Sequence, residues 1–532
     1  MIHARKLASL SASLSASLSA SLSVPALLTL LAGCTVGPDY TPPKREAPGA
    51  YSSLDQTSEA ARNGPLSSTP VAGQPLSQEA LATWWRNFND PVLDSLIERA
   101  VTQNLDLKAA TARVREARAL LGVARSGYYP TVGTSASASR FRNSEKTARG
   151  AFANADREHS LYDASIDASY EIDVFGGVRR GVEAAGAGVD ALIEDRRDVM
   201  ISLAAEVGQA YTDLRGFQRR VNLSEQIVRA SRETVELTRS RFDAGLAGDL
   251  EVAQAQALLF NREAQLPVQQ AGLRTSAHRL GVLLGQEPGS LIAELNPPTV
   301  SQPDAVPPRV PSPPSEVPVG LPSELLLRRP DIRRAERNLA AATARIGVAT
   351  ADLYPRFSLT GAFGFQAGQV GDLFDANARH WTIGPSMRWN IFTGGAVRAR
   401  IQAAGAVQEQ SLYAYDQTIL LSLEEVENSL TNFIQDQARR RALQNAVAAN
   451  ERAVGLSMDR YRSGIGDFLT VLDTQRELYD TQDALVQSEI GVTRSLVSLY
   501  KALGGGWSEQ EQAQNEAPAE NAGGNPGTGS ES

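Results

Sequence analysis

Residues 161–175 read LYDASIDASYEIDVF, and this stretch decides the fold. Tyr162 and Ile166 belong to an apolar series that alternates with a polar series containing Asp163 and Asp167. Alternation with a period of two over a dozen or so residues predicts a β-strand that is apolar on one face and charged on the other. A strand of this length and pattern suits a transmembrane barrel with lipid outside and water inside.

Three further stretches predict strands. Alternating aromatic and aliphatic residues mark 357–366 and 380–392, whereas 131–142 is mostly Ser, Ala and Gly and is the weakest of the set. Four strands are too few to close a barrel, so the strands predict an assembly of several chains. A soluble sandwich, whose apolar face packs on a second sheet, is the alternative that the strands alone leave open.

The second half of the chain repeats the first. The Gly-Val-Ala at 122–124 returns at 347–349, an offset of 225 residues. The Arg-aromatic pair at 241–242 returns at 460–461, an offset of 219 residues. Several anchors in the same order predict an internal tandem repeat, one structural unit used twice. Each copy reads as a helix, two strands and two long helices.

The long helices follow the strands in each copy. The stretches 178–243 and 396–462 contain no proline and carry apolar residues at spacings of three and four. A helix of this length spans roughly 100 Å at 1.5 Å per residue. Each reaches a glycine turn and reverses into a second helix that ends at 284–285 or 503–504, where a Leu-Gly pair gives the expected stop.

The N-terminus predicts a bacterial lipoprotein. Residues 1–33 combine a short basic region with an apolar run, which is the composition of a secretion signal. The signal ends in LAGC at 31–34, which resembles a lipobox, so we expect covalent lipid on Cys34 and no other cofactor. Thr35, in place of the aspartate that retains lipoproteins in the inner membrane, implies the outer membrane. The alternative is a signal that is cut elsewhere and leaves an idle thiol.

Composition excludes several classes of function. The formal net charge of −8 becomes −10 when Arg5 and Lys6 leave with the signal, so no basic surface predicts nucleic-acid binding. A single cysteine forms neither an internal disulfide nor a cysteine-based zinc site. Beyond the signal, no stretch of about 18 apolar residues predicts a membrane-spanning helix. Scattered histidines, without a phosphate-binding loop or a nucleophile elbow, favour neither a metal site nor an enzyme.

Proline and polar residues separate the remaining segments. A linker with eleven prolines between Pro297 and Pro330 is expected to cross the surface as extended chain. The predicted segments are a lipoprotein signal peptide (1–33), a lipidated tether (34–80), the first repeat (81–295), the Pro-rich linker (296–330), the second repeat (331–507) and a disordered tail (508–532).

Several motifs together resemble the outer-membrane factor family, the TolC-like exit ducts of tripartite efflux pumps, and in particular its lipidated OprM/NodT-type branch. They are the lipobox at 31–34, WWRNFNDP at 84–91, LPSELL at 321–326, RRPDI at 328–332, and the Tyr-Pro pairs at 129–130 and 354–355. The set is specific although each motif alone is weak, and the resemblance covers the chain from Cys34 to about Trp507.

The resemblance implies an α+β membrane protein that is a homotrimer. Three chains would each give four strands to a 12-stranded β-barrel, which a long α-helical periplasmic tunnel continues. The implied partners are outer-membrane lipid, a periplasmic membrane-fusion adaptor and an inner-membrane efflux pump of the RND type, with no nucleic acid. The implied function is passive export of drugs or other small solutes. A stand-alone channel, or one for type I protein secretion, is the alternative, and an enzyme is the least favoured reading.

The resemblance also assigns a periplasmic gate at the tunnel tip. Leu469, Asp473 and Arg476 follow one helical face at i, i+4 and i+7. Threefold symmetry would turn the leucines into a ring that seals by dewetting and the aspartates into a ring that selects cations. A solvated Asp473–Arg476 ion pair is the alternative. The full set of expected gate residues is Leu250, Gln254, Tyr461, Arg462, Leu469, Asp473 and Arg476.

The two glycine turns are the expected adaptor contacts. They lie at the far ends of the long helices, so they should be the periplasmic tips, and glycine leaves backbone exposed for close approach. The alternative is that these glycines serve only as helix caps. The expected contact residues are Gly245, Leu246, Gly248, Gly464, Ile465 and Gly466.

Overall fold

The computed structural model describes residues 35–54, 69–72, 78–142, 144, 158–295 and 309–507. The predicted signal, the predicted lipidation residue Cys34 and the predicted tail lie outside these ranges. The chain divides into two units. The sheet unit is 1–43, 113–192 and 334–415, and the helix unit is 44–112, 193–333 and 416–532.

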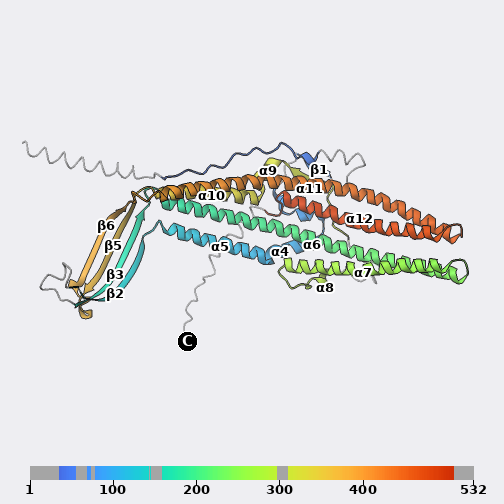
Figure 1. The fold of residues 1–532 in the computed structure, drawn as a ribbon, viewed down its shortest axis with the longest axis horizontal. Helices are drawn as coiled ribbons and strands as arrows, with labels where there is room; N and C mark the ends of the chain where they lie inside the picture. The colour runs from blue at the N-terminus through green and yellow to red at the C-terminus, as the bar shows by residue number, and fades with distance from the viewer. Residues whose placement is uncertain are drawn as a thin grey trace, which may run out of the picture. The chain divides into compact units, whose positions relative to one another are not determined.

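Each half of the chain contains the same main elements in the same order (Figure 1). The matching helices have equal lengths, namely 22 residues for α5 and α10, 67 for α6 and α11, and 35 for α7 and α12. The first set is α5 (Leu105–Ser126), β2 (Thr131–Arg142), β3 (Glu158–Ile172), α6 (Gly177–Asp243) and α7 (Asp249–Leu283). The second set is α10 (Pro330–Ala351), β5 (Arg356–Ala367), β6 (Arg379–Arg388), α11 (Ala396–Arg462) and α12 (Phe468–Ala502).

The remaining described ranges contain ten shorter elements. They are η1 (Ser52–Leu54), β1 (Thr69–Ala72), α3 (Gln78–Ala82), η2 (Trp84–Phe88), α4 (Pro91–Gln103), α8 (Ile292–Leu295), β4 (Glu316–Gly320), α9 (Pro322–Arg328), η3 (Val370–Asp372) and η4 (Ala376–Ala378).

The sheet unit holds a four-stranded sheet with the order β2-β3-β5-β6, and every neighbouring pair is antiparallel (Figure 1). The register aligns Ile166 of β3 with Phe363 of β5, and Phe363 with Trp381 of β6. These three side chains form an apolar row, and all of them are exposed in the single chain. Among the described strands, β2 and β6 each have one edge without a partner.

The opposite face of the sheet is polar because side chains alternate along each strand. Asp163 accepts hydrogen bonds from Ser165 Oγ at 3.2 Å and from Gln366 Nε2 at 3.5 Å. His380 of β6 reaches over β5, so that its Nε2 lies 3.8 Å from Asp163 Oδ2. The sheet therefore separates an apolar face from a hydrogen-bonded polar face.

Strand β3 lies earlier in the sequence than the strand predicted at 161–175. Asp173 leaves the strand because its carboxylate caps the start of α6, accepting from Val178 N at 3.1 Å and Arg179 N at 2.8 Å. Two backbone N–H groups that no helical carbonyl can pair are thereby satisfied. The alternating pattern continues through Val174, so it gave no sign of this cap.

Glycine ends both long helices through the same hydrogen-bond pattern. Gly245 has φ +73°, Gly245 N bonds to Phe242 O at 2.8 Å, and Leu246 N bonds to Arg241 O at 2.8 Å. Gly464 has the same φ of +73°, and its turn makes the matching bonds at 3.0 and 3.1 Å. A glycine in the left-handed region with this pair of bonds is a Schellman end, which fills the last free carbonyls of a helix.

Two expectations for the connecting segments need correction. The helix expected before the strands of the first repeat is two helices, α4 and α5, because Asn104 interrupts them and its side chain bonds Leu283 O and Leu107 N, each at 2.9 Å. The described part of the predicted linker, 309–330, is not extended chain throughout. It contains α9 and also β4, which pairs in parallel with β1.

The main core lies in the helix unit. Its fully buried large side chains include Trp84, Tyr211, Phe433 and Tyr500, and the Trp84 and Tyr500 rings stack at 5.3 Å. Within the described residues, no helix is long and apolar enough to cross a membrane. The WWRNFNDP motif supplies side chains, among them Trp84, to this core. Asp90 of the same motif caps α4, because its carboxylate accepts a hydrogen bond from Val92 N at 3.0 Å.

A buried arginine from the RRPDI motif ties the end of α12 to α11. Arg329 Nη1 donates to Ala502 O at 2.7 Å, and Nη2 donates to Glu425 Oε2 at 2.7 Å. Arg329 also forms a two-bond pair with Asp331, with Nε–Oδ1 at 3.0 Å and Nη2–Oδ2 at 2.8 Å. These partners raise the pKa of the buried guanidinium despite the cost of burial. The motif is thus a structural anchor of the helix unit.

We expect Arg329→Met to lower the free energy of unfolding by about 3 kcal/mol, because it leaves two carboxylates without their cation. Arg86→Met is the matched control, since Arg86 forms an exposed ion pair with Glu98 at 3.3 Å. Losing this exposed ion pair should lower the free energy of unfolding by about 1 kcal/mol or less. Chemical unfolding followed by circular dichroism measures both, and equal losses would contradict the anchor.

Candidate functional site at the ends of the helix hairpins

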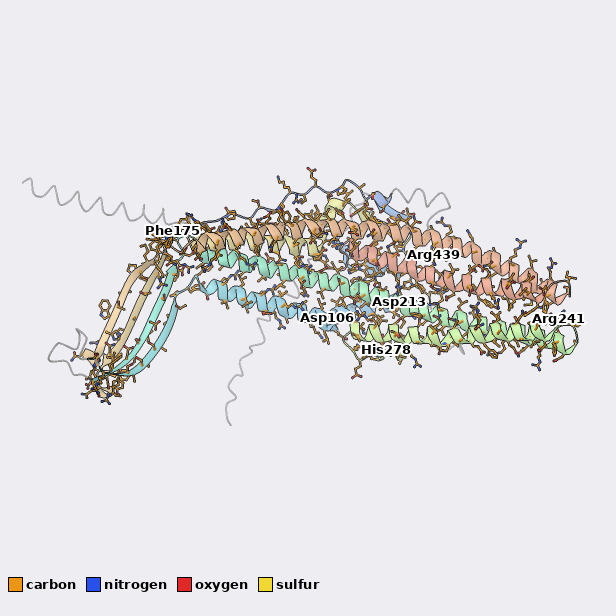
Figure 2. The ribbon with its side chains drawn as sticks, viewed as in Figure 1. Asp106, Phe175, Asp213, Arg241, His278 and Arg439 are labelled. Atoms are coloured by element: carbon orange, nitrogen blue, oxygen red, sulfur yellow. The ribbon has the colours of Figure 1, made fainter. Side chains whose placement is uncertain are left out.

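The candidate site lies where α6 turns into α7 and α11 turns into α12, inside the helix unit. Figure 2 labels Arg241 in the last turn of α6, beside the turn of that hairpin. The Arg241 guanidinium lies 4.5 Å above the Tyr461 ring, and its Nη1 donates to Arg462 O at 3.4 Å. A cation over an aromatic face is attracted by the ring quadrupole. Arg241 therefore joins the two hairpins.

Tyr461 is the centre of these contacts. Its side chain is buried against Phe468, with ring centroids 5.3 Å apart, and its hydroxyl donates to Glu251 Oε2 at 2.7 Å. Burial, and next the hydrogen bond to the Glu251 carboxylate, raise the pKa of Tyr461 to about 12. The neutral phenol is therefore the form that the folded tip holds. Glu251 belongs to the first turn of α7, so the bond crosses from one hairpin to the other.

Of the seven expected gate residues, Tyr461 is buried, Gln254 is half-buried and the other five are exposed. Leu469 and Leu250 are 47% and 70% exposed in the single chain. Asp473 and Arg476 are also exposed, and Arg476 Nη1 lies 3.9 Å from Asp473 Oδ1 of the same chain. Leu469, Asp473 and Arg476 all lie on α12, and the structure brings the latter two together. Gln254 is half-buried and Arg462 is exposed.

The expected adaptor residues occupy the two turns. Gly245 and Gly464 provide the positive φ of the helix ends described above. Leu246 and Ile465 follow them and are 67% and 71% exposed. The remaining two expected contacts are Gly248, which precedes α7, and Gly466, which precedes Asp467 at the start of α12. The capping role is present, and a role in adaptor contact stays a prediction.

Side chains behind the tip, which the sequence did not single out, strengthen the link between the hairpins. Gln475 is buried, and its Nε2 donates to Thr234 Oγ1 at 3.0 Å. Arg262 of α7 donates to Asp480 Oδ1 of α12 at 2.9 Å. The repeat gave a partial signal, because Gln475 and Arg460 follow Gln256 and Arg241 by the same 219 residues. Which partners they meet depends on packing between distant helices.

The described side chains at this site make contacts between and within the two hairpins. Among the described residues, no group of three or more His, Cys, Asp or Glu side chains is placed to hold a metal ion. The tip combines an aromatic–carboxylate bond, a cation over a ring and exposed apolar side chains. Such an arrangement can hold two hairpins together or release them.

Comparisons with known proteins agree on one family. A family model described as outer membrane efflux protein matches residues 96–286 and 321–505. Nodulation protein T of Rhizobium leguminosarum bv. trifolii is 31% identical over 489 residues, which cover 92% of this chain and 98% of that protein. The pyoverdine export outer membrane protein OpmQ of Pseudomonas putida is 36% identical over 427 residues, covering 80% of this chain and 88% of that protein.

Solved structures give the same result. The outer-membrane channel OprN superposes with a TM-score of 0.78 at 36% identity, covering 89% of this chain and all of that one. The MtrE outer membrane channel of Neisseria gonorrhoeae superposes with a TM-score of 0.72 at 29% identity, covering 89% of this chain and 98% of that one.

We expect Tyr461→Phe to lower tip stability by about 1–2 kcal/mol, because the Glu251 carboxylate loses a charge-assisted hydrogen bond. Amide hydrogen exchange in the first turn of α7 and the last turn of α11 measures this change. Tyr413→Phe is the control, since Tyr413 bonds Glu409 at 2.8 Å within one helix and on an exposed surface. Faster exchange in the control than in Tyr461→Phe would contradict a link between hairpins.

The same bond predicts a pH window. The pKa of Tyr461 is raised in the folded chain from 10.0 to about 12, so the contribution to stability is complete below pH 10 and disappears as the pH rises toward 12. Wild-type and Tyr461→Phe tips should therefore exchange at different rates at pH 7 and at converging rates above pH 11. A constant difference across this range would overturn the assignment.

Proposed function

This chain belongs to the outer membrane efflux protein family, and from that premise we propose that it is the outer-membrane exit duct of a tripartite efflux system of the RND type. The duct exports solutes passively, and an inner-membrane pump supplies the energy. The family consists of channel proteins rather than enzymes, in agreement with a site that holds hairpins together.

The observation that carries the proposal is the sheet with two open edges. The N–H and C=O groups on the outer edges of β2 and β6 have no partner strand within the described chain. In hydrocarbon these groups must pair, because no water is present to bond them. Three copies related by threefold symmetry join β2 of one chain to β6 of the next and close a barrel of 12 strands.

The two faces of the sheet fit this assembly. The row of Ile166, Phe363 and Trp381 faces lipid, and the face of Asp163 and Ser165 lines the water-filled interior. Transmembrane barrels alternate in this way along each strand. In the homotrimer the exposed apolar row contacts lipid, whereas in a single chain in water it would contact solvent.

The equal lengths of paired helices support a tandem structural repeat. Each chain contributes two hairpins, so a trimer holds six around one axis, and together they form the periplasmic tunnel. The domain limits remain those predicted from the sequence, with a signal peptide of 1–33 and repeats at 81–295 and 331–507.

At the tunnel tip, threefold symmetry turns exposed side chains into rings. Leu469, with Leu250 beside it, forms the apolar seal, and Asp473 forms the charged ring. Arg476 at 3.9 Å is a counter-charge from the same chain, and Arg462 of a neighbour is the second candidate. The Tyr461–Glu251 bond holds the two hairpins of one chain together.

The further partners are a periplasmic membrane-fusion adaptor and the inner-membrane pump, and the anchors in the outer membrane are the barrel and lipid on Cys34. Relatives carry names that refer to pyoverdine, antibiotics and toluene. Cargo that varies so widely suits a wide water-filled tunnel without a fitted pocket. Small solutes are therefore the cargo class proposed for this chain.

Planar bilayer recording of the purified protein tests the duct. We expect channels, and larger conductance in Leu469→Ala and Asp473→Ala because each removes a ring that narrows the tip. Gln254→Ala, the corresponding change in the first repeat, should have a smaller effect. Trimers that conduct no ions would overturn the duct, and an unchanged conductance in the Leu469/Asp473 double variant would place the constriction elsewhere.

Crosslinking tests adaptor contact at the turns. Cysteines at Ala247 and Ser463, carrying a short crosslinker, should capture the periplasmic adaptor in intact cells because both positions lie in the glycine turns. A cysteine at Ser144, which follows β2 in the sheet unit, is the control. Capture only from Ser144 would reverse the orientation of the duct.

A further inference from the structure

The first described residues lie in a slot of the sheet unit that glycines make possible. A Cβ on Gly176 would come within 2.7 Å of Thr35 Cγ2, and a Cβ on Gly37 within 2.4 Å of the Gly347 Cα. Gly37 and Gly176 have φ values of +93° and +78°, which residues with a Cβ rarely adopt. The backbone after Thr35 therefore touches the start of α6 and the surface of α10 directly.

Arg180 closes over this segment. Its side chain is only 4% exposed, Nε donates to Val36 O at 3.2 Å, and Nη2 donates to Gly37 O at 3.4 Å and to Asp39 Oδ1 at 2.6 Å. Val36 N in turn donates to Phe175 O at 3.1 Å. A buried cation that donates hydrogen bonds to backbone carbonyls fixes the path of that backbone.

The contacts continue beyond the slot. Tyr40 OH donates to Glu336 Oε1 at 2.9 Å, and the Arg337 guanidinium lies 5.9 Å from the Tyr40 ring centroid. Both partners belong to α10. The segment 35–40, which begins the predicted tether, is therefore held at each end.

The two halves of the chain differ at this point. A Cβ on Gly347 would come within 2.7 Å of Arg180 Cγ, so Arg180 crosses α10 where no side chain intervenes. Gly122 occupies the same place in the first Gly-Val-Ala motif, and a Cβ there would meet nothing within 4 Å. Only the second copy uses its glycine to admit another segment.

We propose that this slot is the docking site of the acylated N-terminus, and that it fixes where the lipid on Cys34 enters the membrane relative to the sheet. The inference rests on the proposed lipidation of Cys34. Consecutive Cα atoms lie about 3.8 Å apart, so the lipid attaches within one residue spacing of Thr35. Thr35 packs on Gly176, beside the point where β3 leads into α6. The lipid is then a second fixed membrane contact of the sheet unit.

Fixing the attachment point makes the acyl chains more effective anchors. An anchor held close to the barrel re-enters the membrane from a short distance, which raises its effective concentration there. An anchor on a free tether of the same composition would lack this coupling. Lipid and slot should therefore stabilise the protein cooperatively.

Hydrogen exchange of the full-length protein tests the slot itself. Amides of 35–40 should exchange at least about tenfold faster in Gly347→Ala and Arg180→Ala than in the wild type. Gly122→Ala and Arg179→Ala are the matched controls, because Gly122 has open space and the Arg179 side chain bonds Asp173 rather than the segment. Unchanged exchange in α6 and the sheet shows that a variant is folded. Equal rates for 35–40 in all four variants would overturn the slot.

A double-mutant cycle tests the link to the lipid. Labelling with radioactive fatty acid should appear in the wild type and vanish in Cys34→Ala. Cys34→Ala should lower the thermal midpoint of the trimer in membranes, and this loss should shrink in the Gly347→Ala background but not in Gly122→Ala. Additive losses would overturn the fixed anchor. Absence of label in the wild type would overturn the anchor as well, while conductance reports separately on the duct.

Discussion

The unpaired backbone at the two outer edges of the sheet is the constraint on which the remaining structure depends. A strand edge in lipid needs hydrogen-bond partners, and a single chain with four strands has none to give. In the proposed trimer, symmetric copies supply these partners. The helices that continue from β3 and β6 would follow the symmetry of that proposed trimer, because α6 and α11 begin only a few residues after those strands.

Within this symmetric frame, the two halves of the chain have diverged. Both hairpins end in the same Schellman turn, which uses only local backbone bonds and so tolerates change in the surrounding side chains. The charged pair Asp473 and Arg476 occurs on α12 alone, since Gln254 and Ala257 occupy the corresponding places on α7. The two hairpins therefore have the same backbone turn, but at these two positions α12 carries charged side chains and α7 carries uncharged ones.

Regular patterns in the sequence predicted the regular parts of the structure. The limits of α11, Ala396–Arg462, coincide with the predicted helix because a proline-free run reaches a glycine turn there. The sequence could not predict where β3 ends, because Asp173 fits both the polar series of a strand and a helix cap. Contacts between distant segments were also missed, including the pairing of β4 with β1 and the Tyr461–Glu251 bond. Such contacts depend on which helices become neighbours, and no local pattern records that choice.

The slot around Arg180 has a consequence for the order in which the protein matures. Tyr40 and its partner Glu336 are 296 residues apart, so the N-terminal segment cannot dock until α10 has been made and folded against α6. Contacts across such a separation form late, because the entropy of closing a long loop opposes them. If acylation takes place while the rest of the chain is still unfolded, the nascent protein is already membrane-bound when this loop of 296 residues closes. Docking of residues 35–40 would then follow membrane attachment, and it would distinguish a chain with a folded sheet unit from an unfolded one.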